Sequence, residues 1–142
     1  MYEYSDSQRD FALHMRDISE FFKIRFYGVS SIDSFASYFE DFAKSRGVNL
    51  KRIMLKGFSK NTVLEYVGAS LDRDIPVVMI TWNNRNSDLR NHWITITGLY
   101  SESGTNLMVT SNWGEKRTYD FDEWYDSFSL YKGIVAFDLS RD

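Results

Sequence analysis

The chain has 142 residues, of which 43% are hydrophobic and 17% aromatic, so it can bury one core as a single domain. Its net charge of −3 without a basic run argues against a nucleic-acid partner. Its longest apolar run, residues 75–82, is too short for a membrane span, which needs roughly 18 residues. The sequence contains no cysteine, which excludes disulfides, thiolate metal sites and a cysteine nucleophile among these residues.

The first half of the chain predicts three helices. Apolar residues recur at helical spacing over residues 5–23 and form a stripe of Phe11, Met15, Ile18 and Phe22. Ser30 or Ser31 caps a second helix that ends at Gly47, a residue suited to the left-handed C-terminal position. A short strand over residues 50–56 and a third helix over residues 59–71 follow.

The second half predicts a sheet. Pro76 opens a strand over residues 76–82, whose unbroken apolar run indicates that both faces are covered. The segments that follow are an exposed polar loop at 83–90, a hairpin at 91–111, a strand at 116–119, a short helix at 121–128 and a strand at 133–139. Helices followed by strands with short turns indicate one α+β domain over residues 1–142 with a mostly antiparallel sheet. Its helical part covers about residues 5–72 and its sheet part about residues 75–140.

The hairpin is the most informative stretch, because one of the two histidines stands at its open end. Alternation along its first strand places His92 at the end of an apolar row with Ile94 and Ile96. The second strand presents two faces, which are Leu107, Val109 and Ser111 on one side and Met108, Thr110 and Asn112 on the other.

The choice between these faces decides which polar residue lies beside His92. Placing Leu107 and Val109 with the isoleucines buries more apolar surface, requires a four-residue turn at 101–104 and puts Ser111 next to His92. Met108 gives the other face one apolar residue. Asn112 would reach His92 only if the strand is bulged or the register slips.

The sequence of this hairpin resembles a known family. A strand reading His-Trp-Ile-Thr-Ile-Thr-Gly-Leu-Tyr, followed after a turn by a strand ending Ser-Asn-Trp-Gly, resembles the second half of papain-like cysteine peptidases, in particular the bacterial bacteriocin-processing (double-glycine) peptidases. The segment Gly28-Val29-Ser30-Ser31 between two helices, Gly47 and the Pro76-Val77 pair fit as well. The resemblance covers roughly residues 6–140 and implies a papain-like fold.

In that family a cysteine at a helix N-terminus is the nucleophile, a strand histidine is its base, and an Asp or Asn at the end of the next strand orients the histidine. The resemblance implies that His92 is the base. It assigns the orienting position, two residues before Trp113, to Ser111, with Asn112 as the alternative. Gln8 would match the oxyanion-hole glutamine loosely, and His14 would lie near the cysteine position.

The missing nucleophile has two explanations. A cysteine-bearing helix lies upstream of Met1 in a longer precursor, or the chain is complete and its first helix replaces the cysteine helix. In the second case His14 lies well inside the helix, where a helix dipole does little to activate a nucleophile.

Three functions follow from these observations. The first is a non-catalytic peptidase homologue, a pseudoenzyme, whose residual groove at His92, with Trp93 and Trp113 as walls, binds a peptide or protein partner. The second is an active cysteine peptidase whose nucleophile lies on a segment outside this chain. The third is a structural or interaction domain without a function in the cleft.

Simpler readings exist for the same residues. His92 can be a core histidine satisfied by a carbonyl, Ser111 and Asn112 can be polar ends of a strand, and the tryptophans can be core residues. No metal-ligand spacing, phosphate loop or cofactor motif is present, so we predict no metal and no cofactor. The first residues lack a signal-peptide pattern, and we expect a soluble domain whose compartment and oligomeric state the sequence does not indicate.

Overall fold

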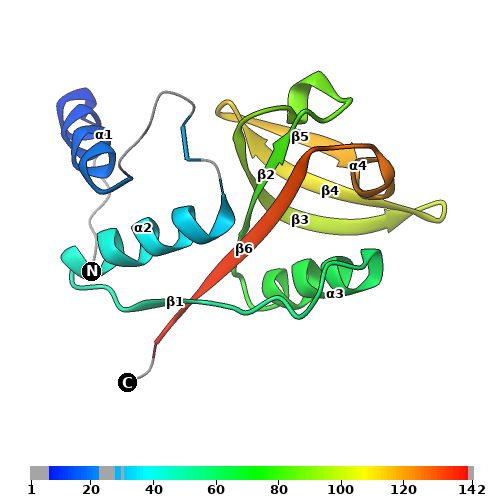
Figure 1. Cartoon of the computed structure of the whole chain (residues 1–142), viewed down its shortest axis with the longest axis horizontal. Helices are drawn as coiled ribbons and strands as arrows, with labels where there is room; N and C mark the ends of the chain where they lie inside the picture. The colour runs from blue at the N-terminus through cyan, green and yellow to red at the C-terminus, as the bar shows by residue number, and fades with distance from the viewer. Residues whose placement is uncertain (1–6, 23–27, 30, 141–142) are drawn as a thin grey trace. The chain divides into compact units, whose positions relative to one another are not determined.

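The computed structural model describes residues 7–22, 28–29 and 31–140 (Figure 1). These residues form an α+β fold with four α-helices and a six-stranded sheet in the order β1-β6-β2-β3-β4-β5. The pairings from β6 through to β5 are antiparallel. The predicted fold class, α+β with a mostly antiparallel sheet, is confirmed at this level.

The chain divides into two compact units. The first unit contains residues 1–51 and 139–142, and the second contains residues 52–138. The boundaries fall inside β1 (Leu50–Arg52) and at the end of β6 (Tyr131–Leu139). The third helix therefore belongs to the same unit as most of the sheet.

The first unit contains the helices α1 (Gln8–Phe22) and α2 (Ile32–Ser45). Helix α2 begins where the Ser31 side chain accepts a hydrogen bond from the Ser34 amide, and it ends before Gly47, which has a φ of 73°. The two helices pack through ring contacts such as Phe22 against Phe35, with centroids 5.4 Å apart. The predicted α1 stripe is buried only at its C-terminal end, since Phe22 is buried while Phe11 and Met15 are exposed. The predicted helix start at Ser5, the end at Lys23 and the alternative cap Ser30 lie outside the described residues.

The second unit holds the remaining elements of the fold. In chain order they are α3 (Lys60–Leu71), β2 (Val77–Trp82), the 3-10 turn η1 (Ser87–Leu89), β3 (Trp93–Glu102), β4 (Thr105–Asn112), β5 (Glu115–Asp120), α4 (Phe121–Asp126) and β6. Strand β2 lies between β6 and β3, and its neighbouring residues Met79 and Ile80 are both fully buried. Consecutive strand residues point to opposite faces, so β2 is covered on both sides, as predicted.

One core cluster holds this unit together. It joins buried residues of α3 and α4 to one face of the sheet, namely Val63, Val67, Val77, Met79, Leu89, Ile94, Ile96, Met108, Phe121, Trp124, Ile134 and Ala136. The side chain of Trp124 also donates a hydrogen bond from Nε1 to Thr81 Oγ1 over 2.9 Å, which fixes α4 against β2.

The predicted register of the hairpin is wrong. Strands β3 and β4 are joined by the two-residue turn Ser103-Gly104, with φ of 51° and 84°, rather than by four residues. Thr97 is an extra residue in β3, because Ile96 pairs with Thr110 and Gly98 with Val109.

The bulge changes which residues share the buried face. Before the bulge, Ile96 lies opposite Thr110, and after it Leu99 lies opposite Met108, which is fully buried. The prediction assumed strict alternation in β3, which one inserted residue breaks. Asn112 therefore lies on the buried side, and Ser111 is exposed and pairs with Thr95.

Two smaller predictions are also corrected. The loop at 83–90 is not simply exposed, because it contains η1 and the buried residues Asn84 and Leu89. The short helix ends at Asp126 rather than at residue 128, and Phe128 is exposed beyond it.

Candidate functional site

His92 is hydrogen-bonded to Asn112 at the open end of the hairpin. Its ring atom Nε2 lies 2.7 Å from Asn112 Oδ1, and its other ring nitrogen, Nδ1, lies 3.0 Å from the carbonyl oxygen of Arg90. The sequence analysis favours Ser111 at this position and gives Asn112 as the alternative for a bulged strand or a slipped register. The bulge at Thr97 is the physical reason that Asn112 occupies it instead.

The orientation of the Asn112 amide is fixed by its other neighbours. Its Nδ2 donates to the backbone carbonyl of Asp88 over 3.0 Å and to Tyr119 Oη over 3.0 Å. Since a carbonyl can only accept, Nδ2 must face Asp88, and Oδ1 must face His92. The amide therefore presents an acceptor to the ring.

Both nitrogens of His92 thus face oxygens that act as acceptors in this arrangement. A neutral imidazole carries one N–H and can donate to only one of them, whereas the imidazolium donates to both. A ring that donates from both nitrogens has no free lone pair with which to take a proton from a nucleophile. In this geometry both ring nitrogens of His92 already face oxygen partners, so neither is open to take a proton from a nucleophile.

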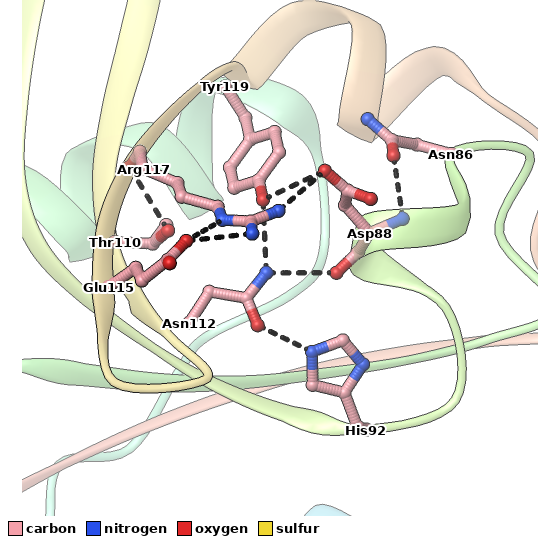
Figure 2. Close-up of polar contacts among 8 residues, drawn as sticks. All are labelled: Asn86, Asp88, His92, Thr110, Asn112, Glu115, Arg117 and Tyr119. Atoms are coloured by element: carbon pink, nitrogen blue, oxygen red, sulfur yellow. Dashed lines mark hydrogen bonds and ion pairs between the residues drawn. The ribbon is translucent and has the colours of Figure 1, made fainter.

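Three charged residues, Asp88, Glu115 and Arg117, lie beside Asn112, as Figure 2 shows. Arg117 on β5 donates to Glu115 from Nε and Nη2, and its Nη1 donates to Asp88 Oδ2 over 3.1 Å. The hydrogen bond to Glu115 raises the pKa of Arg117 above its usual range. Arg117 therefore ties β5 to η1, whose first turn Asn86 caps by accepting from the Asp88 amide.

Trp113 covers the His92 ring from the turn between β4 and β5. The two ring centroids are 5.1 Å apart and the planes are inclined by 28°, so the rings are stacked. Trp113 is 79% exposed and has a φ of 53°, a left-handed conformation that is unusual for a bulky side chain. The next residue, Gly114, has a φ of 76°, so the pair forms a two-residue turn with both φ values positive. We call the group His92, Asn112 and Trp113 the His92 corner.

The other residues proposed from the sequence are not part of this corner. Trp93 follows His92 and pairs with Ile80 across β2 and β3. Gln8 is exposed on α1, and His14 on the same helix packs edge-on against Phe42 with centroids 5.7 Å apart. Both belong to the first unit, so their proposed roles at His92 stay predictions.

Sequence reasoning missed Asp88, Tyr119 and Arg117, which hold Asn112 and η1 in place. The one available signal was Asn86, whose position two residues before Asp88 is typical of a side chain that caps a turn. The contacts of Tyr119 and Arg117 depend on the β4–β5 register, which alternation alone could not supply.

Within the described ranges, no group of three or more His, Asp and Glu side chains could hold a metal ion. None of the helices in that part of the chain is long and apolar enough to cross a membrane. Comparisons of the sequence and structure with protein-family models, curated proteins and solved structures found no match. The papain-like relationship therefore stays a prediction from the sequence.

Proposed function

We propose that this chain is a non-catalytic relative of papain-like peptidases in which the His92 corner binds a peptide or protein partner. The observation that carries the proposal is that Trp113 is exposed and has a left-handed backbone conformation. An exposed tryptophan in a left-handed turn costs stability, and such strain is typical of residues kept for binding or catalysis. Exposed tryptophans are also frequent anchors of binding interfaces.

The hydrogen bonds of His92 support the non-catalytic part of the proposal. Its Nδ1 faces the Arg90 carbonyl and its Nε2 faces Asn112, so neither nitrogen is open to a nucleophile. The pair of His92 and Asn112 agrees with the family pattern of a strand histidine oriented by an asparagine. An active peptidase completed by a nucleophile outside this chain would require the Arg90 contact to break.

The binding role can be tested by selecting peptides from a displayed random library on the purified wild-type chain. We expect enriched peptides whose affinity falls at least about tenfold in Trp113→Asn, since a buried aromatic anchor contributes about 2 kcal/mol or more. Tyr100→Ser is the matched control, because Tyr100 is an exposed aromatic residue on the same hairpin near its other turn. Equal losses in both variants, or no enriched peptide, would argue against the His92 corner as a binding site.

The catalytic question needs a separate measurement. Incubation of the same peptides with the chain should give no cleavage, in the wild type or in His92→Ala. Cleavage by the wild type that disappears in His92→Ala would overturn the non-catalytic assignment.

A further inference from the structure

A polar hollow in the second unit contains none of the three residues of the His92 corner, although Tyr119, which accepts a hydrogen bond from Asn112, is part of its lining. It has a volume of about 190 Å³ and lies between the loop after β2 and the junction of β5 with α4. Its polar lining includes Arg85, Asn86, Asp120 and Glu123. We call it the Arg85 pocket.

Several polar groups of the Arg85 pocket have no partner in the described part of the chain. The Arg85 guanidinium and the Glu123 carboxylate make neither a hydrogen bond nor an ion pair there. Asp120 uses only Oδ1, which accepts from the Glu123 amide, and Asn86 uses only Oδ1, which accepts from the Asp88 amide. Two donors and two carboxylates therefore face the same small space with bonding capacity left over.

Other charged side chains in the second unit, unlike Arg85 and Glu123, have hydrogen-bond or ion-pair partners among the described residues. Arg117 is paired with Asp88 and Glu115, Lys60 is paired with Asp126, and Lys132 donates to two backbone carbonyls. Arg85 and Glu123 line one hollow, yet their charged atoms lie more than 4.0 Å apart, beyond the limit for an ion pair. The gap between these opposite charges is complementary to a molecule that carries both.

We propose that the Arg85 pocket binds a small zwitterion of amino-acid size. Asp120 and Glu123 accept hydrogen bonds from its ammonium group, and Arg85 and Asn86 donate hydrogen bonds to its carboxylate. A volume of about 190 Å³ is smaller than the roughly 300–1,000 Å³ of pockets for drug-sized ligands, which suits one amino acid. This inference does not depend on the proposed function of the His92 corner, because the two use different residues.

A second, wider hollow next to the Arg85 pocket can hold the side chain of the ligand. It shares Arg85 and Glu123 with the pocket, has a volume of about 550 Å³ and is lined by the exposed ring of Phe128. An apolar side chain would cover part of that ring. The same zwitterionic chemistry is presented by a free amino acid and by a dipeptide with free ends, and the experiment separates these two sources.

The test titrates the full chain by calorimetry with each proteinogenic L-amino acid and with the dipeptide Gly-Met. We expect at least one of these zwitterions to bind. For a bound amino acid, the N-acetylated form lacks the ammonium and the amide form lacks the carboxylate, so each should bind at least about tenfold more weakly. Tighter binding of the dipeptide than of any amino acid would assign the pocket to short peptides.

Variants locate the site. Arg85→Gln and Glu123→Gln remove one charge each from exposed positions, and each should weaken binding at least about tenfold. Glu65→Gln is the matched control, because Glu65 is exposed on α3 and does not line the pocket. The proposal is overturned if no zwitterion binds, if the N-acetylated and amide forms bind as well as the parent, or if the two pocket variants keep wild-type affinity.

Discussion

Asn112 is the residue on which the geometry of the His92 corner depends. It is 1% exposed and makes hydrogen bonds to His92, to the Asp88 carbonyl and to Tyr119. Asn112→Ala leaves these partly buried groups without their partner, so we expect the free energy of unfolding to fall by about 1–3 kcal/mol. Denaturant titration followed by circular dichroism measures this change.

Ser111 provides the control within the same strand. It is exposed, and its side chain makes no hydrogen bond to the described residues. Ser111→Ala should change the free energy of unfolding by no more than about 0.5 kcal/mol. If Ser111→Ala were the more damaging of the two substitutions, the register without the bulge would be the correct one.

Tyr66 joins α3 to β6 and to the segment after β1. Its hydroxyl donates to the Ile53 carbonyl and accepts from the Ala136 amide, each over 2.8 Å. Tyr66→Phe removes both bonds from a partly buried place, and we expect a loss of about 2 kcal/mol in the free energy of unfolding at neutral pH.

The same tyrosine predicts a pH dependence. Burial raises the pKa of Tyr66 above its ordinary value of 10.0, although the hydrogen bond from Ala136 opposes the shift. The folded state therefore holds this proton more tightly than the unfolded state, and stability decreases as the pH rises from about 10 through the raised pKa. The free energy of unfolding of the wild type should decrease more steeply above pH 10 than that of Tyr66→Phe. Parallel curves would contradict this assignment.

At the scale of elements, the turn at Trp113-Gly114 combines strain with exposure. Two-residue turns with positive φ at both positions favour Asn-Gly, and Trp113→Asn creates that sequence. Relief of the backbone strain should stabilise the folded state by about 1–3 kcal/mol, and loss of the stacking on His92 should destabilise it by about 0.5–1.5 kcal/mol. We expect the melting temperature of Trp113→Asn to equal or exceed that of the wild type. A clear decrease would mean that Trp113 is retained for stability rather than for binding.

The hairpin shows how far sequence patterns reach. Helical spacing, serine caps and Gly47 were sufficient to predict α1, α2 and α3 nearly to their ends, because those signals are local. The register of β3 with β4 was wrong because one inserted residue, Thr97, reverses the faces, and Thr97 carries no mark of a bulge. Gly98 was the nearest signal in the sequence, because a glycine inside a strand often marks a bulge or a close approach of the backbone. In the structure, a Cβ at Gly98 would lie 3.2 Å from Val109 Cβ.

The same limit applies to the candidate site. His92 and Trp113 could be selected from the sequence because they are rare residue types at the ends of strands. The assignment of Asn112, and the contacts of Asp88 and Arg117, depended on long-range pairing that alternation does not determine. The Arg85 pocket was not predicted at all, because its residues come from a polar loop and a strand–helix junction without a shared motif.

At the scale of the whole molecule, strand β2 and the N-terminal half of helix α1 differ in how well their apolar residues are covered. Strand β2 is paired on both edges and holds the fully buried Met79 and Ile80. Helix α1 exposes Phe11 and Met15 by 61% and 47%, so little of its N-terminal half is buried. Local opening is easiest where few apolar contacts are lost.

This difference predicts the pattern of amide hydrogen exchange. Amides of β2 should exchange only through global unfolding, so that their opening free energy equals the free energy of unfolding measured with denaturant. Amides in the first two turns of α1 should open with a free energy lower by several kcal/mol, since fraying there exposes little new apolar surface. Exchange followed by NMR at neutral pH resolves both groups in one sample. Equal protection of α1 and β2 would show that the N-terminal half of α1 is covered in solution. Dilution of the sample would then show whether a second copy of the chain covers it, because only that contact depends on concentration.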